Sequence, residues 1–158
     1  LAFGTGTHPT THMCLEWMDG HDFGGETVVD YGCGSGVLGI AAAIKHARAV
    51  ICVDNDPQAL TATSDNAKRN GVQDVVSGFS PERFNPQASD VVLANILAGP
   101  LLELAPRLGA SVRPGGWLVL SGILEEQAEE VENAYSGEFR GIKRKVMDEW
   151  VLITGIKK

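Results

Sequence analysis

The stretch TVVDYGCGSGVLGIAAAIKHARAVICVD, residues 27–54, decides the fold of this chain of 158 residues. An apolar run at 27–29 is followed by a glycine-rich turn at 32–36, an Ala- and Ile-rich segment at 37–47 and a second apolar run at 49–53. Short apolar runs without polar alternation are typical of strands buried on both faces of a parallel sheet. The stretch therefore predicts a strand, a right-handed crossover helix and a second, parallel strand.

The same alternation continues along the chain. Apolar runs at 91–94 and 117–120 predict two further strands. Asp56 as N-cap and Pro57 at the first helical position predict the start of a helix between them. Strands that alternate with helices in this way are typical of a doubly wound α/β fold.

The C-terminal part is expected to hold two more helices and a hairpin. One helix begins at Gly99 and is kinked or shortened by Pro106, and another covers 125–135. The strand-like runs 140–147 and 150–157 are joined by a tight turn, which forces them to be antiparallel. The sequence thus predicts a Rossmann-like sheet, mostly parallel, with one antiparallel strand near the C-terminus.

Composition and charge exclude several classes of function. With 13 Lys and Arg against 20 Asp and Glu, the net charge of −7 disfavours a general nucleic-acid surface. There is no apolar run long enough to cross a membrane, and residues 1–5 lack the basic start of a secretory signal. Three scattered cysteines without a C-x-x-C pair favour a reducing, cytoplasmic compartment over a disulfide framework. No membrane partner and no direct nucleic-acid partner is expected.

A metal site is not expected either. His8 and His12 stand four residues apart, a spacing that can bind zinc on a helix. Pro9 occupies the position where a zinc protease has its glutamate, and no third ligand is evident in the sequence.

The turn after the first strand has the features of a site for a nucleoside-type cofactor. Gly32, Gly34 and Gly36 allow a tight turn and a close approach of a ligand to the backbone, at the N-terminus of a helix whose N–H groups are free. An acid about 20 residues beyond the first glycine, at the tip of the next strand, is where such sites hold a ribose diol. Asp54 stands at that position. The alternative is a glycine-rich turn that only packs a helix against a sheet.

The sequence pattern of the glycine loop distinguishes between two candidate cofactors. The glycines at 34, 36 and 39 match the dinucleotide fingerprint G-x-G-x-x-G, which by itself is a weak signal. An acid two residues before the first glycine, Asp30, counts against NAD. The D-x-G-x-G-x-G form, with Asp54 and the terminal hairpin, resembles class I S-adenosylmethionine-dependent methyltransferases. This resemblance implies a seven-stranded sheet, a glycine loop beside the methionine part of the cofactor, and Asp54 on its ribose hydroxyls.

Two further segments are more specific. The segments AFGTGTHPTT at 2–11 and NILA at 95–98, together with DYGCGSG at 30–36, resemble the bacterial ribosomal protein L11 methyltransferase family. The resemblance implies methyl transfer from S-adenosylmethionine to lysine and N-terminal amino groups of that large-subunit ribosomal protein. It also implies that residues 1–158 are a single catalytic domain, without the N-terminal domain with which the family grips its protein substrate.

The resemblance also assigns roles to individual residues. The first segment is expected to cover the cofactor, with Thr11 and His8 among the residues that contact it. Asp30, the loop glycines, Asp54 and Asn95 are expected to line the rest of the cofactor site. Without the resemblance, the first segment reads as a frayed terminus followed by a helix start at Pro9.

Asn95 is the candidate for catalysis. It follows an apolar strand, so it is expected at the sheet edge where α/β folds bind ligands. Its amide oxygen can accept a hydrogen bond from a substrate amine and direct the nitrogen lone pair at the cofactor's methyl group. The alternative role is a cap for the helix that begins at Gly99. A methyltransferase that acts on a protein glutamine or a nucleobase is the other functional reading, although those families usually have two prolines and an aromatic ring after the asparagine.

Overall fold

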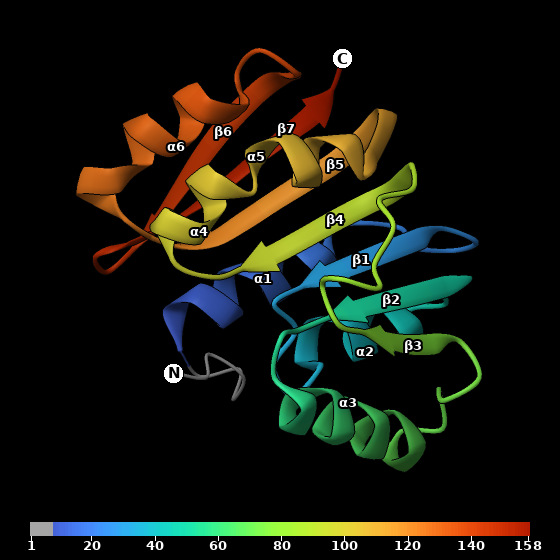
Figure 1. The fold of residues 1–158 in the computed structure, drawn as a ribbon. Helices are drawn as coiled ribbons and strands as arrows, with labels where there is room; N and C mark the ends of the chain where they lie inside the picture. Colours follow the sequence, from blue (N-terminus) through green and yellow to red (C-terminus); the bar gives the residue numbers. More distant parts are fainter. Residues whose placement is uncertain (1–7) are drawn as a thin grey trace.

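The computed structural model describes residues 8–158, which form a twisted sheet with helices on both faces (Figure 1). Within these residues the sheet has seven strands in the order β3-β2-β1-β4-β5-β7-β6. The strands are β1 (Thr27–Tyr31), β2 (Ala49–Val53), β3 (Val76–Phe79), β4 (Ser89–Asn95), β5 (Val112–Leu124), β6 (Phe139–Met147) and β7 (Trp150–Lys157). The helices are α1 (Pro9–Asp19), α2 (Val37–Ile44), α3 (Pro57–Arg69), α4 (Ala98–Glu103), α5 (Ala105–Ala110), the 3₁₀ helix η1 (Glu125–Gln127) and α6 (Ala128–Tyr135).

The strand directions confirm the predicted fold class. Strands β3, β2, β1, β4 and β5 pair in parallel, whereas β7 is antiparallel to both β5 and β6. The single antiparallel strand therefore lies second from the edge of the sheet, and β6 forms the edge itself (Figure 1).

Each face of the sheet carries its own hydrophobic core. Met13 of α1 and Leu38 of α2 belong to one buried cluster, and Leu101 of α4, Leu108 of α5 and Val131 of α6 belong to the other. In β1, β2 and β4 every side chain is at least partly buried, since both faces of these strands are covered. This explains why the runs in β1, β2 and β4 are continuously apolar.

Several predicted boundaries are corrected by the structure. The helix expected from Gly99 begins one residue earlier, at Ala98. Its expected interruption by Pro106 is confirmed: two short helices meet at Leu104, because Pro106 lacks an N–H group and its ring clashes with a continuous helix. The helix expected over 125–135 begins with a 3₁₀ turn. Strand β3 matches none of the apolar runs, because its sequence VSGF lies at the open edge of the sheet and its two middle residues are exposed.

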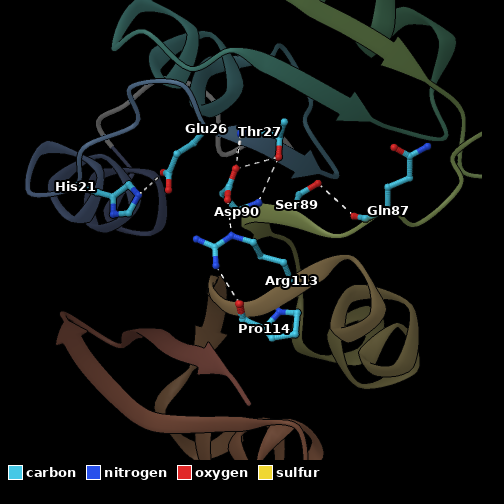
Figure 2. A network of polar contacts seen from close by, with 8 residues as sticks. All are labelled: His21, Glu26, Thr27, Gln87, Ser89, Asp90, Arg113 and Pro114. Atoms are coloured by element: carbon cyan, nitrogen blue, oxygen red, sulfur yellow. Dashed lines mark hydrogen bonds and ion pairs between the residues drawn. The ribbon is translucent and has the colours of Figure 1, made fainter.

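A polar network ties together the amino ends of three strands (Figure 2). The Asp90 carboxylate in β4 accepts hydrogen bonds from the backbone N–H of Thr27 in β1, at 2.8 Å, and from its hydroxyl, at 3.2 Å. The same carboxylate pairs with Arg113 of β5. This network lies at the amino ends of the strands, whereas the predicted site residues lie at their carboxyl ends, which are called the carboxyl edge below.

None of the helices in residues 8–158 has the length and apolar character needed to span a bilayer.

Candidate functional site

The glycine loop joins β1 to α2 at the carboxyl edge of the sheet. Gly32, Gly34 and Gly36 all have positive φ angles, of 75°, 55° and 85°. The Val53 carbonyl at the tip of β2 accepts the N–H groups of Gly32 and Cys33, at 2.7 and 3.0 Å. A methyl group placed on Gly34 would meet nothing within 4 Å, so the middle of the loop is open to a ligand.

Asp54 holds this loop against the end of β2. One of its carboxylate oxygens accepts the Gly34 N–H at 2.9 Å, and the other accepts the Asp56 N–H at 3.0 Å. Each oxygen has two lone pairs, so the carboxylate can still accept hydrogen bonds from a diol. The side chain is partly exposed beside the open part of the loop.

Asp30 lies inside β1 rather than at its tip, and it is only 2% exposed. Its carboxylate accepts the N–H of Gly39, in the first turn of α2, at 2.9 Å. The N-cap of helix α2 is Gly36, which has no side chain to cap it, so Asp30 takes over this function from β1. Burial raises the pKa of Asp30 to about 7; the negative charge of Asp54 adds to the increase, and the Gly39 hydrogen bond opposes it. Its expected contact with a cofactor stays a prediction.

The first turn of α1 supplies the third part of the site. The helix begins at Pro9 as predicted, and the Nδ1 atom of His8 accepts the N–H of Thr10 at 3.3 Å as its N-cap. His8 also lies edge-on to the ring of Trp150, with the ring centres 5.3 Å apart. Residues 2–7 of the predicted covering segment lie outside the described residues, so their expected role stays a prediction.

Asn95 connects this helix to the sheet. Its Nδ2 group donates to the hydroxyl of Thr11 at 3.2 Å, and Thr11 is buried. Its Oδ1 atom is shielded from solvent and has no hydrogen-bond partner among residues 8–158. The alternative role, a cap for the following helix, is wrong, because the N-cap of α4 is Leu97 and no side chain caps it.

The two halves of the site are adjacent. A methyl group on Gly32 would lie 2.3 Å from the Cγ2 atom of Ile96, the residue after Asn95. The glycine loop and the segment after β4 are therefore in direct contact at the carboxyl edge of the sheet. Parallel α/β sheets bind their ligands at this edge.

The predicted site does not include His12, and the structure shows no metal cluster in its described part. His12 is exposed on α1, where it pairs with Glu16 at 3.8 Å. Among residues 8–158 no three His, Cys, Asp or Glu side chains come together in a way that could hold a metal ion. Sequence reasoning also missed Ser121, whose hydroxyl donates to the Thr10 carbonyl at 2.9 Å; its place at the end of an apolar run, level with Asn95, was the available signal.

A sheet of this strand order, with a glycine loop after β1 and an acid after β2, defines the class I methyltransferase fold. Solved structures agree: the RNA methyltransferase from Salinibacter ruber, in complex with S-adenosyl-L-homocysteine, superposes with a TM-score of 0.71 at 18% identity, over 93% of this chain and 92% of that one. That likeness establishes the fold alone.

The family model described as Ribosomal protein L11 methyltransferase (PrmA) matches residues 1–158, and the chain belongs to this family. The ribosomal protein L11 methyltransferase of Marinobacter nauticus is 54% identical over 159 residues, covering 100% of this chain and 53% of that protein. The one from Photobacterium profundum is 54% identical, covering 99% and 54%. The chain thus spans about half the length of the curated relatives that it matches. A crystal structure of ribosomal protein L11 methylase from Lactobacillus delbrueckii subsp. bulgaricus has a TM-score of 0.88 at 29% identity, covering 97% of this chain and 81% of that one.

Proposed function

We propose that this chain is the catalytic domain of a methyltransferase that modifies lysine and N-terminal amino groups of ribosomal protein L11. Family membership over residues 1–158 supports the protein substrate. The observation that carries the chemistry is Asn95, whose buried Oδ1 atom lacks a partner in the described part of the chain, beside the glycine loop. A buried acceptor without a hydrogen bond is costly, and a substrate amine would remove that cost.

The residues at the sheet edge fit S-adenosylmethionine. The open face of Gly34 leaves space next to the backbone, and the carboxylate of Asp54 keeps unused acceptor capacity for ribose hydroxyls. The carboxylate of Asp30 stabilises the start of α2, which follows the glycine loop, by accepting the Gly39 N–H. When bound, this cofactor supplies an activated methyl group on a sulfonium.

Asn95 would orient the substrate. An amide oxygen that accepts an N–H of the substrate amine restricts the direction of the nitrogen lone pair. Since such transfer depends mainly on alignment, fixing this direction supplies a large part of the rate acceleration. Thr11 fixes the amide in turn, because its buried hydroxyl accepts the Nδ2 group.

The protonation of the amine sets the remaining barrier. A lysine with a pKa of about 10.4 loses its proton at pH 7 at a cost of about 4.6 kcal/mol, whereas an N-terminal amine with a pKa of about 8 costs about 1.4 kcal/mol. Burial of the amine beside Asn95 would lower its pKa and reduce this cost. We infer that both kinds of amine can react, the N-terminal amine with the smaller barrier.

Substrate capture is a separate part of the proposal. Relatives have about as many residues again outside the matched part, and we propose that these capture L11. Remote binding energy of this kind places the reacting group and appears mainly in kcat/KM. This chain alone is expected to bind the cofactor and to methylate L11 poorly.

Asn95→Ala tests the catalytic assignment. A version of the chain extended to the full length of its relatives is incubated with L11 and radiolabelled S-adenosylmethionine, and the modified amines are located by mass spectrometry. The substitution is expected to lower methyl transfer about 100-fold or more, because the amine loses its alignment. Affinity for S-adenosylmethionine should change little, since the glycine loop and Asp54 remain.

Gly99→Ala is the matched control. Gly99 lies in α4, the helix that follows Asn95, and a methyl group there would meet nothing within 4 Å. Near-normal turnover by Asn95→Ala would remove Asn95 from the mechanism. An extended parent that transfers no methyl to L11 would contradict the proposed function.

A further inference from the structure

Strand β5 places Ser121 next to the candidate catalytic residue Asn95. Ser121 pairs with Asn95 in the register between β4 and β5, and it is fully buried. Its hydroxyl donates to the Thr10 carbonyl at 2.9 Å, which attaches the first turn of α1 to the sheet. The next residue in this turn, Thr11, accepts the Asn95 amide. The orientation of Asn95 therefore depends on a helix that Ser121 holds in place.

Gly122 lies against the backbone of Ile96, the residue after Asn95. The register of β5 shifts between Leu120 and Ile123, and Gly122 in this bulge has a φ of 88°. A methyl group on Gly122 would lie 2.3 Å from the carbonyl oxygen of Ile96, 2.8 Å from its carbonyl carbon and 3.2 Å from its nitrogen. These are backbone atoms, which cannot move aside like the end of a side chain. The segment after Asn95 can follow its path only because residue 122 has no side chain.

We infer that Ser121 and Gly122 are positioning residues for methyl transfer: Gly122 sets the path of the segment that follows Asn95, and Ser121 anchors the helix turn that holds its amide. The inference rests on the proposed function of Asn95. Both residues act mainly through Asn95. Although the Ile96 side chain touches Gly32, the glycine loop has backbone and carboxylate contacts of its own that hold it. Those contacts are the hydrogen bonds to the Val53 carbonyl and to Asp54.

Two variants test the inference. Gly122→Ala should displace the segment after β4, and a misplacement of about 1 Å can lower kcat about 100-fold. Ser121→Ala removes the donor to the Thr10 carbonyl and should lower kcat less, by about tenfold. The dissociation constant for S-adenosylmethionine should stay within about twofold of the parent value in both, as Asp54 is untouched.

Gly141→Ala is the matched control for backbone strain. Gly141 also lies in a bulge, in β6, with a φ of 61°, but a methyl group there meets only the Cδ1 atom of Ile156, at 4.0 Å. An alanine at this position has the same kind of left-handed backbone strain, but it does not contact the site. Its kcat should equal that of the parent.

The experiment combines turnover on L11, in the chain extended to the length of its relatives, with NMR of the Asn95 side-chain amide in this chain. We expect lower kcat and a shifted Asn95 amide signal in Gly122→Ala and Ser121→Ala, and neither change in Gly141→Ala. If Gly122→Ala does not fold, Ser121→Ala and its NMR signal decide the question. An unshifted Asn95 signal with parental kcat in the folded variants overturns the inference, as does an equal loss in Gly141→Ala. A parent that binds no S-adenosylmethionine contradicts the proposed function instead, and the NMR comparison still tests the positioning.

Discussion

Asp54 illustrates how one side chain can hold a loop and keep acceptor capacity for a ligand. Its two carboxylate oxygens accept one backbone N–H each, from Gly34 and Asp56, so the side chain is fixed before any ligand arrives. Preorganised acceptors lose little conformational freedom on binding. The same carboxylate is therefore expected to position the glycine loop and to recognise a ribose.

Asp54→Ala should weaken binding of S-adenosylmethionine about tenfold or more, because a hydrogen bond to a charged group contributes about 1.5–3 kcal/mol. Loss of the Gly34 contact adds to the effect. The measurement is isothermal titration calorimetry. Asp56→Ala is the matched control, since this neighbouring carboxylate caps α3 through Gln58 and has no contact with the loop. Equal affinities for parent and Asp54→Ala would show that Asp54 is not a ligand.

Helix α2 depends on a residue from another element. Its N-cap is Gly36, which offers no side chain, and the Asp30 carboxylate in β1 satisfies the N–H of Gly39 instead. A methyl group on Gly39 would lie 2.7 Å from the sulfur of Cys52, so helix and sheet are in very close contact here. The start of α2 beside the glycine loop is thus set by its packing on β1 and β2.

Asp30→Asn should make the stability of the chain less dependent on pH. Burial raises the pKa of Asp30 in the fold to about 7, above its unfolded value of about 4. The folded state then holds the proton more tightly, so the contribution of this group to stability falls as pH rises from about 4 to 7 and levels off above 7. Asparagine keeps an acceptor for the Gly39 N–H and does not titrate.

The midpoint of urea unfolding checks this expectation at pH 5 and pH 8. Relative to the parent, Asp30→Asn should gain stability between the two values. Asp65→Asn, at an exposed position of α3, serves as the control and should show no such trend. A constant difference between parent and Asp30→Asn would mean that Asp30 does not titrate in this range.

At the scale of elements, the sequence predicted best where burial is two-sided. The run 49–53 is β2 to the residue, since both of its faces are covered. The helix start at Pro57 is correct, because a cap and a proline are local signals. Strand β3 could not be located in this way, since an edge strand needs only partial burial and its four residues include Ser77 and Gly78.

The candidate site was predictable in its parts but not in its connections. The glycine loop and Asp54 follow a spacing in the chain, and the structure places them in contact. The contact between Asn95 and Thr11 joins residues 84 positions apart, and no local pattern indicates it. The same holds for Gly122, because no local pattern indicates that the backbone of Ile96 lies close to it. Such contacts are determined by tertiary packing.

At the scale of the whole molecule, the two edges of the sheet have different tasks. At the amino edge, Asp90 links the starts of β1, β4 and β5 (Figure 2). At the carboxyl edge, the loop after β1 contacts the segment after β4, and Asn95, whose buried Oδ1 atom has no partner in residues 8–158, contacts the start of α1. The Asp90 network lies at the amino ends of the strands, and the residues predicted to bind ligands lie at the carboxyl ends.

Thermal unfolding of the chain with different ligands tests most directly whether this carboxyl edge binds S-adenosylmethionine. At 100 times its dissociation constant, S-adenosylmethionine should stabilise the fold by about 2.7 kcal/mol, and its demethylated product should do the same at the same multiple of its own constant. For a chain of this size that corresponds to an increase in Tm of roughly 5–10 °C, whereas NAD should leave Tm unchanged. An increase in Tm with NAD, and none with S-adenosylmethionine, would contradict the account.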